Sequence, residues 1–268
     1  MLSLRTVRAQ RPEQLALLGA LLALAIVAWV VTGDRMGSME PMPGMALGGL
    51  GFYVTVWVVM MAAMMIPSVA PTVLIYDRLR GESLARGDRA PVDATALFLC
   101  GYLLVWTGAG LVAYALVELV RSLDPPLLAW DEAGRYVAAG VIVAAAAYQL
   151  TSAKEACLAA CRNPMVLAER WRDGRAGAME LGIRYGAWCL GCCWALMAAL
   201  FAVGVMSLGW MALIAAFIGA ERLLPRPTAA RSAVALSLLV LGLGVASFPA
   251  DLPGFSEPDG GSSMRMMR

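Results

Sequence analysis

Histidine is absent from this chain of 268 residues, and charged side chains make up only 15% of it. Without histidine, no serine–histidine or cysteine–histidine catalytic pair can form, and the commonest metal ligand of proteins is missing. The formal net charge is only +2, which gives no sign of a nucleic-acid-binding surface. No glycine-rich phosphate loop follows a candidate strand. We therefore expect neither an enzyme nor a nucleic-acid partner.

Apolar residues are in excess, since 60% of the chain is hydrophobic and its mean hydropathy is +0.72. Soluble domains contain about 45–50% apolar and about 25% charged residues. A water-soluble core of this length cannot bury so much apolar surface, whereas a lipid bilayer can surround it. The composition therefore predicts an all-α fold, a polytopic bundle of transmembrane helices.

Seven apolar segments are predicted to cross the bilayer, whose hydrocarbon core is about 30 Å thick. The uncharged run 187–220 would be roughly 50 Å long as one helix at about 1.5 Å per residue. It is too long for a single crossing, so we divide it at Ser207-Leu208-Gly209. The seven predicted spans are 15–32, 47–75, 95–120, 136–153, 183–206, 208–224 and 229–248.

Most of the 21 Lys and Arg residues fall on the side of the N-terminus when the spans are counted in order. Cytoplasmic loops carry such an excess, so the N-terminus is predicted to be cytoplasmic. Residues 1–250 are predicted to form one transmembrane domain. Residues 251–268 are rich in Pro, Gly, Ser and acidic side chains and are predicted to be a flexible tail, which contains Met264, Met266 and Met267.

Soft sulfur is abundant, with 17 methionines and six cysteines. One group of methionines recurs at every third position in the first predicted outer loop, at Met36, Met39, Met42 and Met45. Thioether sulfur is a soft neutral ligand that suits Cu(I). The spacing favours metal capture on the outside, and an apolar loop resting on the membrane surface is the alternative.

A second group lies within the second predicted span, at Met60, Met61, Met64 and Met65. Helix neighbours three and four residues apart share a face, so at least two of these sulfurs can approach one ion. Pro67 and Pro71 follow directly and are expected to bend the helix, which is tolerated within a membrane only where protein or a cavity covers the break. The alternative is that the methionines only fill space beside the bend.

The third group consists of cysteines on the predicted cytoplasmic side: Cys157, Cys161, Cys189, Cys192 and Cys193. Thiolates bind Cu(I) and Zn(II) tightly. Met197 continues the helix face of Cys189 and Cys193, whereas Cys100 is expected to be an inert core residue. Methionines outside and within the membrane, followed by cysteines inside, suggest a path along which a soft ion could move. Glu118 and Glu221 are expected to lie at the membrane interface beside Arg121 and Arg222.

Three ordered segments resemble a bacterial family of predicted metal-binding integral membrane proteins that is associated with a copper-chaperone role. The segments are WVVMMAAMMIPSVAP (57–71), YQLTSAKEACLAACRNPM (148–165) and CLGCCWALMAALFAVGVMSLGWMALIAAFIGAERLLP (189–225). The resemblance implies copper handling in the bacterial inner (plasma) membrane, with delivery to a copper-requiring enzyme. It implies ligand roles for Met60, Met61, Met64, Met65, Cys157, Cys161, Cys189, Cys192 and Cys193.

The leading hypothesis is a multi-pass membrane chaperone or carrier of copper(I), which exchanges the ion with a copper-requiring enzyme or a soluble copper-binding protein. A second hypothesis is a thiol–disulfide oxidoreductase that uses Cys189-x-x-Cys192. It leaves the methionine spacing unexplained. A third hypothesis is a non-catalytic assembly scaffold in which sulfur only packs the core.

Overall fold

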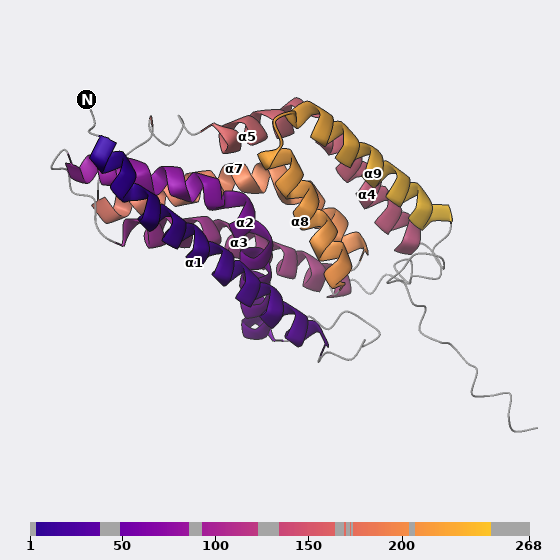
Figure 1. The fold of residues 1–268 in the computed structure, drawn as a ribbon. Coiled ribbons are helices and arrows are strands. Elements are labelled where there is room, and N and C mark those ends of the chain that lie inside the picture. Colours follow the sequence, from indigo (N-terminus) through magenta and orange to yellow (C-terminus); the bar gives the residue numbers. More distant parts are fainter. Residues whose placement is uncertain are drawn as a thin grey trace, which may run out of the picture.

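The computed structural model describes residues 4–37, 49–85, 93–122, 134–163, 169, 172, 174–203 and 207–247. Within these residues the chain is all-helical and contains no strand, which confirms the predicted fold class (Figure 1). The helices are α1 (Leu4–Gly37), α2 (Leu50–Ala85), α3 (Ala94–Ser122), α4 (Arg135–Gln149), α5 (Ser152–Arg162), α7 (Gly174–Val203), α8 (Leu208–Leu223) and α9 (Pro227–Ser247).

Five of these helices, α1, α2, α3, α7 and α9, are long and apolar enough to cross a membrane. The pair α4 and α5 adds a sixth candidate if it forms one broken span, bent by 64°. Helix α8 coincides with the sixth predicted span, but its 16 residues fall short of the roughly 20 that a crossing requires. The described residues thus contain five or six candidate membrane spans, in agreement with the predicted polytopic helical bundle. The count of seven spans and the orientation stay predictions.

The run that we divided at Ser207-Leu208-Gly209 is indeed two helices. Helix α7 ends at Val203, and α8 begins at Leu208 after Ser207, whose backbone is extended. The segment 136–153 differs from its prediction as one continuous helix. It breaks after Gln149 because the Thr151 hydroxyl accepts a hydrogen bond from the Lys154 amide (3.3 Å) and starts α5 as an N-cap.

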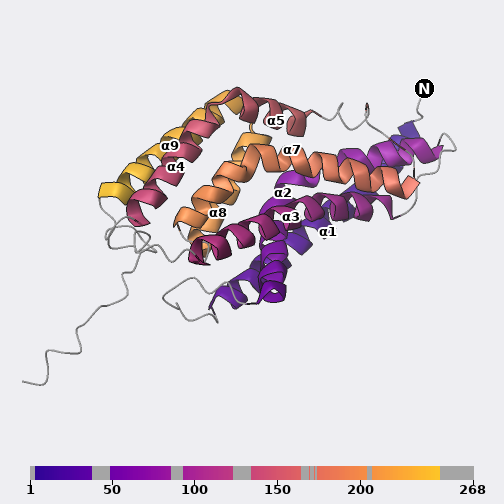
Figure 2. The same cartoon turned by 180° about the vertical axis from the view of Figure 1, so that it is seen from behind.

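Helix α2 is helical throughout but bends part-way along its length, as Figures 1 and 2 show from opposite sides. Pro67 and Pro71 lie near its middle, and each removes a backbone donor and pushes against the preceding turn. Both prolines are exposed, while the residues from Met60 to Ile66 are buried. The predicted bend is therefore present, with the proline side of the helix turned away from the protein core.

Helices α3 and α7 pack at very close range because glycines line their contact. A Cβ atom on Gly182 would lie 2.1 Å from the Phe98 carbonyl oxygen, and one on Gly101 would lie 2.4 Å from that of Met179. Gly186, one turn beyond Gly182, faces the carbonyl of Tyr102 at 3.0 Å in the same way. Small residues four apart let membrane helices approach closely. This seam sets Tyr102 opposite the cysteine-bearing part of α7.

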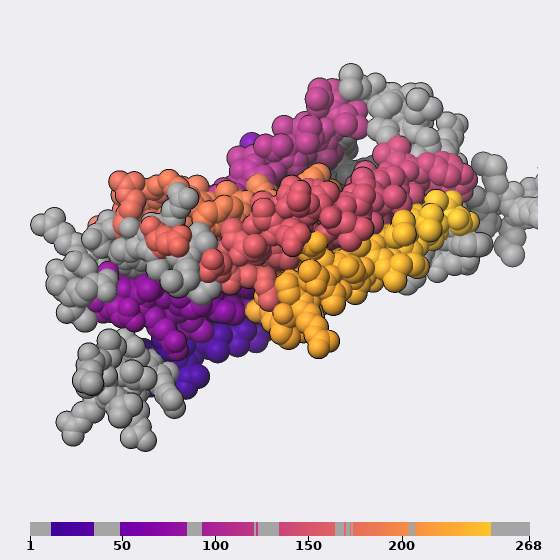
Figure 3. Space-filling view, turned by 90° about the horizontal axis from the view of Figure 1, so that it is seen from above, coloured from indigo at the N-terminus to yellow at the C-terminus, as the bar shows by residue number. Residues whose placement is uncertain are grey.

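Helices α4 and α9 run side by side along one face of the molecule, with α5 continuing from α4 (Figure 3). Helix α8 lies between this pair and the group formed by α1, α2, α3 and α7 (Figures 1 and 2). Large apolar side chains such as Val27 and Val240 are exposed on the outer helices, as expected where lipid replaces water. The arrangement directs the C-terminal end of α8 toward α5, α7 and the bend of α2.

Candidate metal centre

The methionine group of α2 is buried in protein. Met60, Met61, Met64 and Met65 each expose 2% or less of their surface. The indole of Trp57 anchors the turn before them by donating to the Trp106 carbonyl (2.7 Å) and stacking on Phe201. The thioethers therefore face the core and not lipid, which a ligand role requires.

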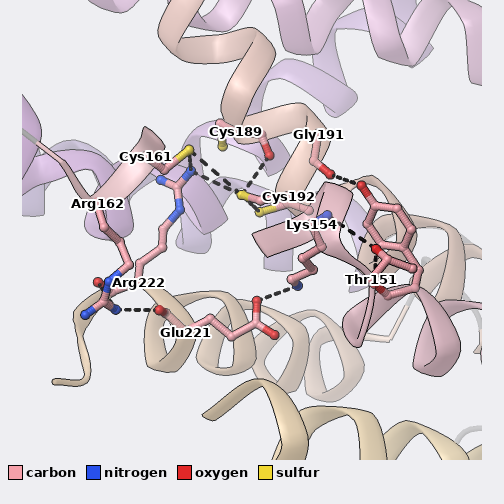
Figure 4. Close-up of polar contacts among 11 residues, drawn as sticks. Thr151, Lys154, Cys161, Arg162, Cys189, Gly191, Cys192, Glu221 and Arg222 are labelled. Atoms are coloured by element: carbon pink, nitrogen blue, oxygen red, sulfur yellow. Dashed lines mark hydrogen bonds and ion pairs between the residues drawn. The ribbon is translucent and has the colours of Figure 1, made fainter. Parts of the chain in front are cut away.

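Cys161 of α5 and the cysteines of α7 come together where these two helices pack against each other (Figure 4). The Sγ atoms of Cys161 and Cys192 lie 4.0 Å apart, and those of Cys192 and Cys193 lie 3.3 Å apart. Cys189, one turn earlier on α7, contacts the Tyr102 hydroxyl at 3.0 Å. All four cysteines are buried, and none forms a disulfide. We call Cys161, Cys189, Cys192 and Cys193 the thiol cluster.

The other two cysteines lie outside the thiol cluster. Cys157 is half-buried and packs against α7, since a Cβ on Gly191 would lie 2.7 Å from its Sγ. The Tyr148 hydroxyl donates to the carbonyl of the same Gly191 (2.7 Å) and holds α4 against α7. Cys100 is exposed on α3, and our expectation that it would be a core residue is wrong.

Arg222 stands beside the thiol cluster and was assigned from the sequence only to the interface next to Glu221. Its side chain is buried, and Nη2 lies 3.5 Å from the Cys161 Sγ and 3.8 Å from the Cys192 Sγ. Its Nη1 donates to the Ser68 hydroxyl (3.4 Å), and Nε has no hydrogen-bond partner. Among the described residues it contacts no carboxylate, so the negative charge nearest to it would be a thiolate.

Glu221, which the sequence led us to expect at the membrane interface, is enclosed by protein in the structure. Its Oε2 lies 2.6 Å from Nζ of Lys154, and both side chains are almost completely enclosed. The partners come from α5 and α8, which are far apart in the chain, so the sequence alone did not pair them. Buried charges require a partner because an isolated charge in a low-dielectric interior is costly. The ion pair therefore fixes the position of α8 along α5.

Arg162 holds the end of α8 in place. Its guanidinium donates to the carbonyls of Glu221 (2.6 Å), Arg222 (2.8 Å) and Leu224 (2.6 Å). The last carbonyls of a helix lack partners within it, so a cationic side chain stabilises them. Because Arg162 directly follows Cys161, one short segment both supplies a thiol and positions Arg222 beside that thiol.

Ser68 connects the methionine group to the thiol cluster. Its hydroxyl donates to the Met65 carbonyl (2.9 Å) and accepts from Arg222. Met64 and Met65 precede it by four and three residues, so they lie about one turn away on the face that Ser68 presents to Arg222. The near end of the methionine group thus points along α2 toward the thiol cluster.

The structure places some of the predicted ligand residues side by side and others apart. It brings Cys161 together with Cys189, Cys192 and Cys193 and buries the α2 methionines. Met36 lies in the last turn of α1, and the other loop and tail methionines lie outside the described residues: Met39, Met42, Met45, Met264, Met266 and Met267. Within the described residues, no three His, Cys, Asp or Glu side chains are grouped so as to hold a metal ion. Any site there would combine two thiols or use thioethers.

Sequence reasoning missed Arg222, Lys154, Ser68 and Tyr102. One signal was present, since a charged residue within or at the end of an apolar run is by default a functional candidate in a membrane protein. Glu221 and Arg222 end such a run directly after 36 uncharged residues, 185–220. Ser68 and Tyr102 gave no local signal, because their roles depend on contacts between helices.

No curated protein and no solved structure gives a significant match to this chain. One family model does match, over residues 54–245, and it is described as the copper chaperone PpoB2. The match spans most of the chain, from the first turns of α2 to the end of α9, and includes the α2 methionines and the thiol cluster. This confirms the resemblance noted from the three sequence segments. The chain is therefore a member of the PpoB2 family of copper chaperones.

Proposed function

We propose that this protein binds Cu(I) within the membrane and hands it on, as a chaperone or carrier, through the thiol cluster and the α2 methionines. The observation that carries the proposal is the 4.0 Å separation of the Cys161 and Cys192 sulfurs, contributed by two different helices. A zinc–thiolate bond is about 2.3 Å long, and on that scale two thiolates on opposite sides of one ion stand at most about 4.6 Å apart. At the observed 4.0 Å, two such bonds would meet at an angle of about 120°, so the separation fits a strongly bent two-sulfur site.

Charge supports the same assignment. Two thiolates and one Cu(I) carry a net charge of −1, which a buried site does not tolerate alone. The guanidinium of Arg222, within 3.8 Å of both sulfurs, brings the sum to zero. A divalent ion on the same two thiolates would instead leave an excess positive charge beside Arg222. The arrangement therefore favours a monovalent soft cation.

The α2 methionines supply weaker neutral ligands next to this site. Thioethers bind Cu(I) but carry no charge, so an ion held by them alone leaves more easily than one held by thiolates. Met64 and Met65 lie one turn from Ser68, which contacts Arg222. Copper would step between the methionine group and the thiol pair, and its partner would be a copper-requiring enzyme or a soluble copper-binding protein.

The test is copper binding by the purified protein in lipid nanodiscs. We expect Cu(I), supplied under reducing conditions, to bind in a near-integral ratio, and X-ray absorption to report sulfur as the only ligand type. Absence of binding that competes with a Cu(I) chelator would overturn the proposal. A reversible disulfide between Cys189 and Cys192 without copper binding would instead favour the thiol–disulfide oxidoreductase.

A further inference from the structure

A small cavity opens beside the thiol cluster, between α2, α5, α7 and α8. Its volume is about 90 Å³, and its lining includes Ser68, Thr72, Cys161, Arg162, Tyr185 and Arg222. The rim residues Pro71, Asn163 and Leu223 are exposed, whereas Cys161, Ser68 and Arg222 are buried at the inner end. The cavity thus leads from the surface of the protein to one of the two thiols that we assign to copper.

The lining of this cavity mixes apolar side chains with polar and cationic ones. Two guanidinium-bearing residues line it, and the described lining contains no carboxylate. Arg162 uses its donors on the carbonyls that end α8, so its charge is fixed there. Arg222 keeps Nε unpartnered and directs Nη2 at the Cys161 sulfur. An entering ligand therefore meets positive charge directly beside the thiol.

We propose that this cavity is the port through which an anionic thiolate ligand reaches the copper, and that Arg222 makes the port selective for negative charge. The inference rests on the proposed function for its copper step. Its cavity and charge, however, can be tested without the metal.

The exchange step balances without any redox partner. An entering thiolate forms a Cu–S bond to Cu(I) held by Cys161 and Cys192, and the bond between copper and the Cys161 sulfur then breaks. Copper remains Cu(I), no proton moves, and Cys161 is left as a thiolate 3.5 Å from the Arg222 guanidinium. Before the exchange, Arg222 balances the charge of the copper-bound thiol pair, since it also lies near the Cys192 sulfur. The entering thiolate adds one negative charge, so the site carries a net charge of −1 after the exchange.

The size of the cavity limits what can enter. The cavity volume of about 90 Å³ leaves room for a few water molecules. This is enough for the end of one thiol-bearing side chain and too little for a whole peptide. The entering group is therefore either a small free thiol or a single cysteine that projects from a partner protein.

The first experiment uses the copper-free protein and measures how fast charged methanethiosulfonates label Cys161, read by peptide mass spectrometry. In the folded protein, the anionic sulfonatoethyl reagent should label Cys161 faster than the cationic trimethylammonioethyl reagent. The ratio of these two rates should exceed the same ratio on the denatured chain by at least about tenfold. Arg222→Met should abolish the preference, and Arg222→Lys should retain it. Equal rates, a preference for the cation, or no labelling of Cys161 in the folded protein would overturn the port.

The second experiment measures copper transfer out of the protein. Ile75 lines the cavity and bears neither charge nor sulfur, so Ile75→Trp should obstruct it while leaving equilibrium Cu(I) affinity unchanged. Ile26→Trp, on the exposed side of α1, is the matched control. We expect Ile75→Trp to slow transfer to mercaptoethanesulfonate by at least about tenfold, and Ile26→Trp to have no effect.

Two acceptors distinguish the sources of the thiolate. Transfer to mercaptoethanesulfonate identifies a small free thiol, whereas transfer only to an acidic peptide carrying Cys-x-x-Cys identifies a protein cysteine. Unchanged transfer to both acceptors in Ile75→Trp would contradict the port. If the protein binds no copper at all, the proposed function fails, while the labelling result on the copper-free protein still decides whether the port exists.

Discussion

The α2 methionines and the thiol cluster are two sulfur sites built in opposite ways. The methionines come from two turns of one helix, carry no charge and are visible in the sequence as Met-Met-Ala-Ala-Met-Met. The thiol cluster is assembled from α5 and α7, and α8 adds the buried cation Arg222. Local spacing specifies the first site, and helix packing specifies the second. Under the proposed function, the loosely binding thioethers are local, whereas the tightly binding thiolates take their charge compensation from another helix.

Removal of the charged sulfur pair should have the largest effect. In Cys161→Ser/Cys192→Ser, hard hydroxyl oxygens replace both soft thiolates at nearly the same volume. We expect Cu(I) affinity to fall at least about 1,000-fold, or about 4 kcal/mol, by chelator competition. Cys100→Ser, at an exposed thiol outside the cluster, is the matched control and should bind as the parent does. Parent-like affinity in the double variant would remove the thiol pair from the site.

Removal of one charge from the buried Lys154–Glu221 ion pair should have the next largest effect, which is a loss of folding stability. Lys154→Met leaves Glu221 buried without its cation, and breaking such a pair costs about 3–5 kcal/mol. Lys154→Met/Glu221→Gln removes both charges and should recover much of that loss, which a double-mutant cycle of thermal unfolding would measure.

Arg175→Gln is the control for this pair, since Arg175 and its partner Asp93 are both exposed, at 74% and 46%. An exposed pair contributes about 0–1 kcal/mol, so the control should barely change the unfolding temperature. An equal loss in Arg175→Gln and Lys154→Met would mean that the buried pair has no special role in placing α8.

Replacement of the α2 methionines should have a smaller effect, on the rate of copper transfer. Met60, Met61, Met64 and Met65 changed together to Leu keep nearly the same volume and apolarity while losing all four sulfurs. We expect the variant to fold, to keep the tight binding of the thiol pair, and to transfer copper about tenfold more slowly in a stopped-flow assay. A loss of tight binding as large as that of the double cysteine variant would show that the methionines, and not the thiols, hold the ion at equilibrium.

The difference between the two sites also explains what the sequence could predict. Apolar length predicted the helices, and the excess over one membrane thickness predicted the break near Ser207. Met60 and Met64 were predicted to share a face because helix periodicity is local. The contact between Cys161 and Cys192 was not predictable, since it depends on how α5 packs against α7, where Gly191 leaves room for Cys157, and on the α5 segment started by Thr151.

The inward direction of the charged side chains was not predicted, for a different reason. Long cationic side chains at the end of an apolar run commonly extend to the membrane surface, so Arg222 was assigned to the interface. In the structure it turns inward because Arg162 fixes the end of α8 and two sulfurs stand within 3.8 Å of it. The direction of a charged side chain depends on partners that only the assembled fold supplies.

The smallest predicted effect separates the two ends of the methionine group. Met64 and Met65 lie one turn from Ser68, which contacts Arg222, whereas Met60 and Met61 lie one turn further away. Met64→Leu/Met65→Leu should therefore slow transfer to or from the thiol pair about three- to fivefold more than Met60→Leu/Met61→Leu does. The two variants change the same number of sulfurs in equally buried surroundings, so each serves as the other's control. Equal rates would mean that copper does not pass from one site to the other along α2, and the two sulfur sites would then act independently.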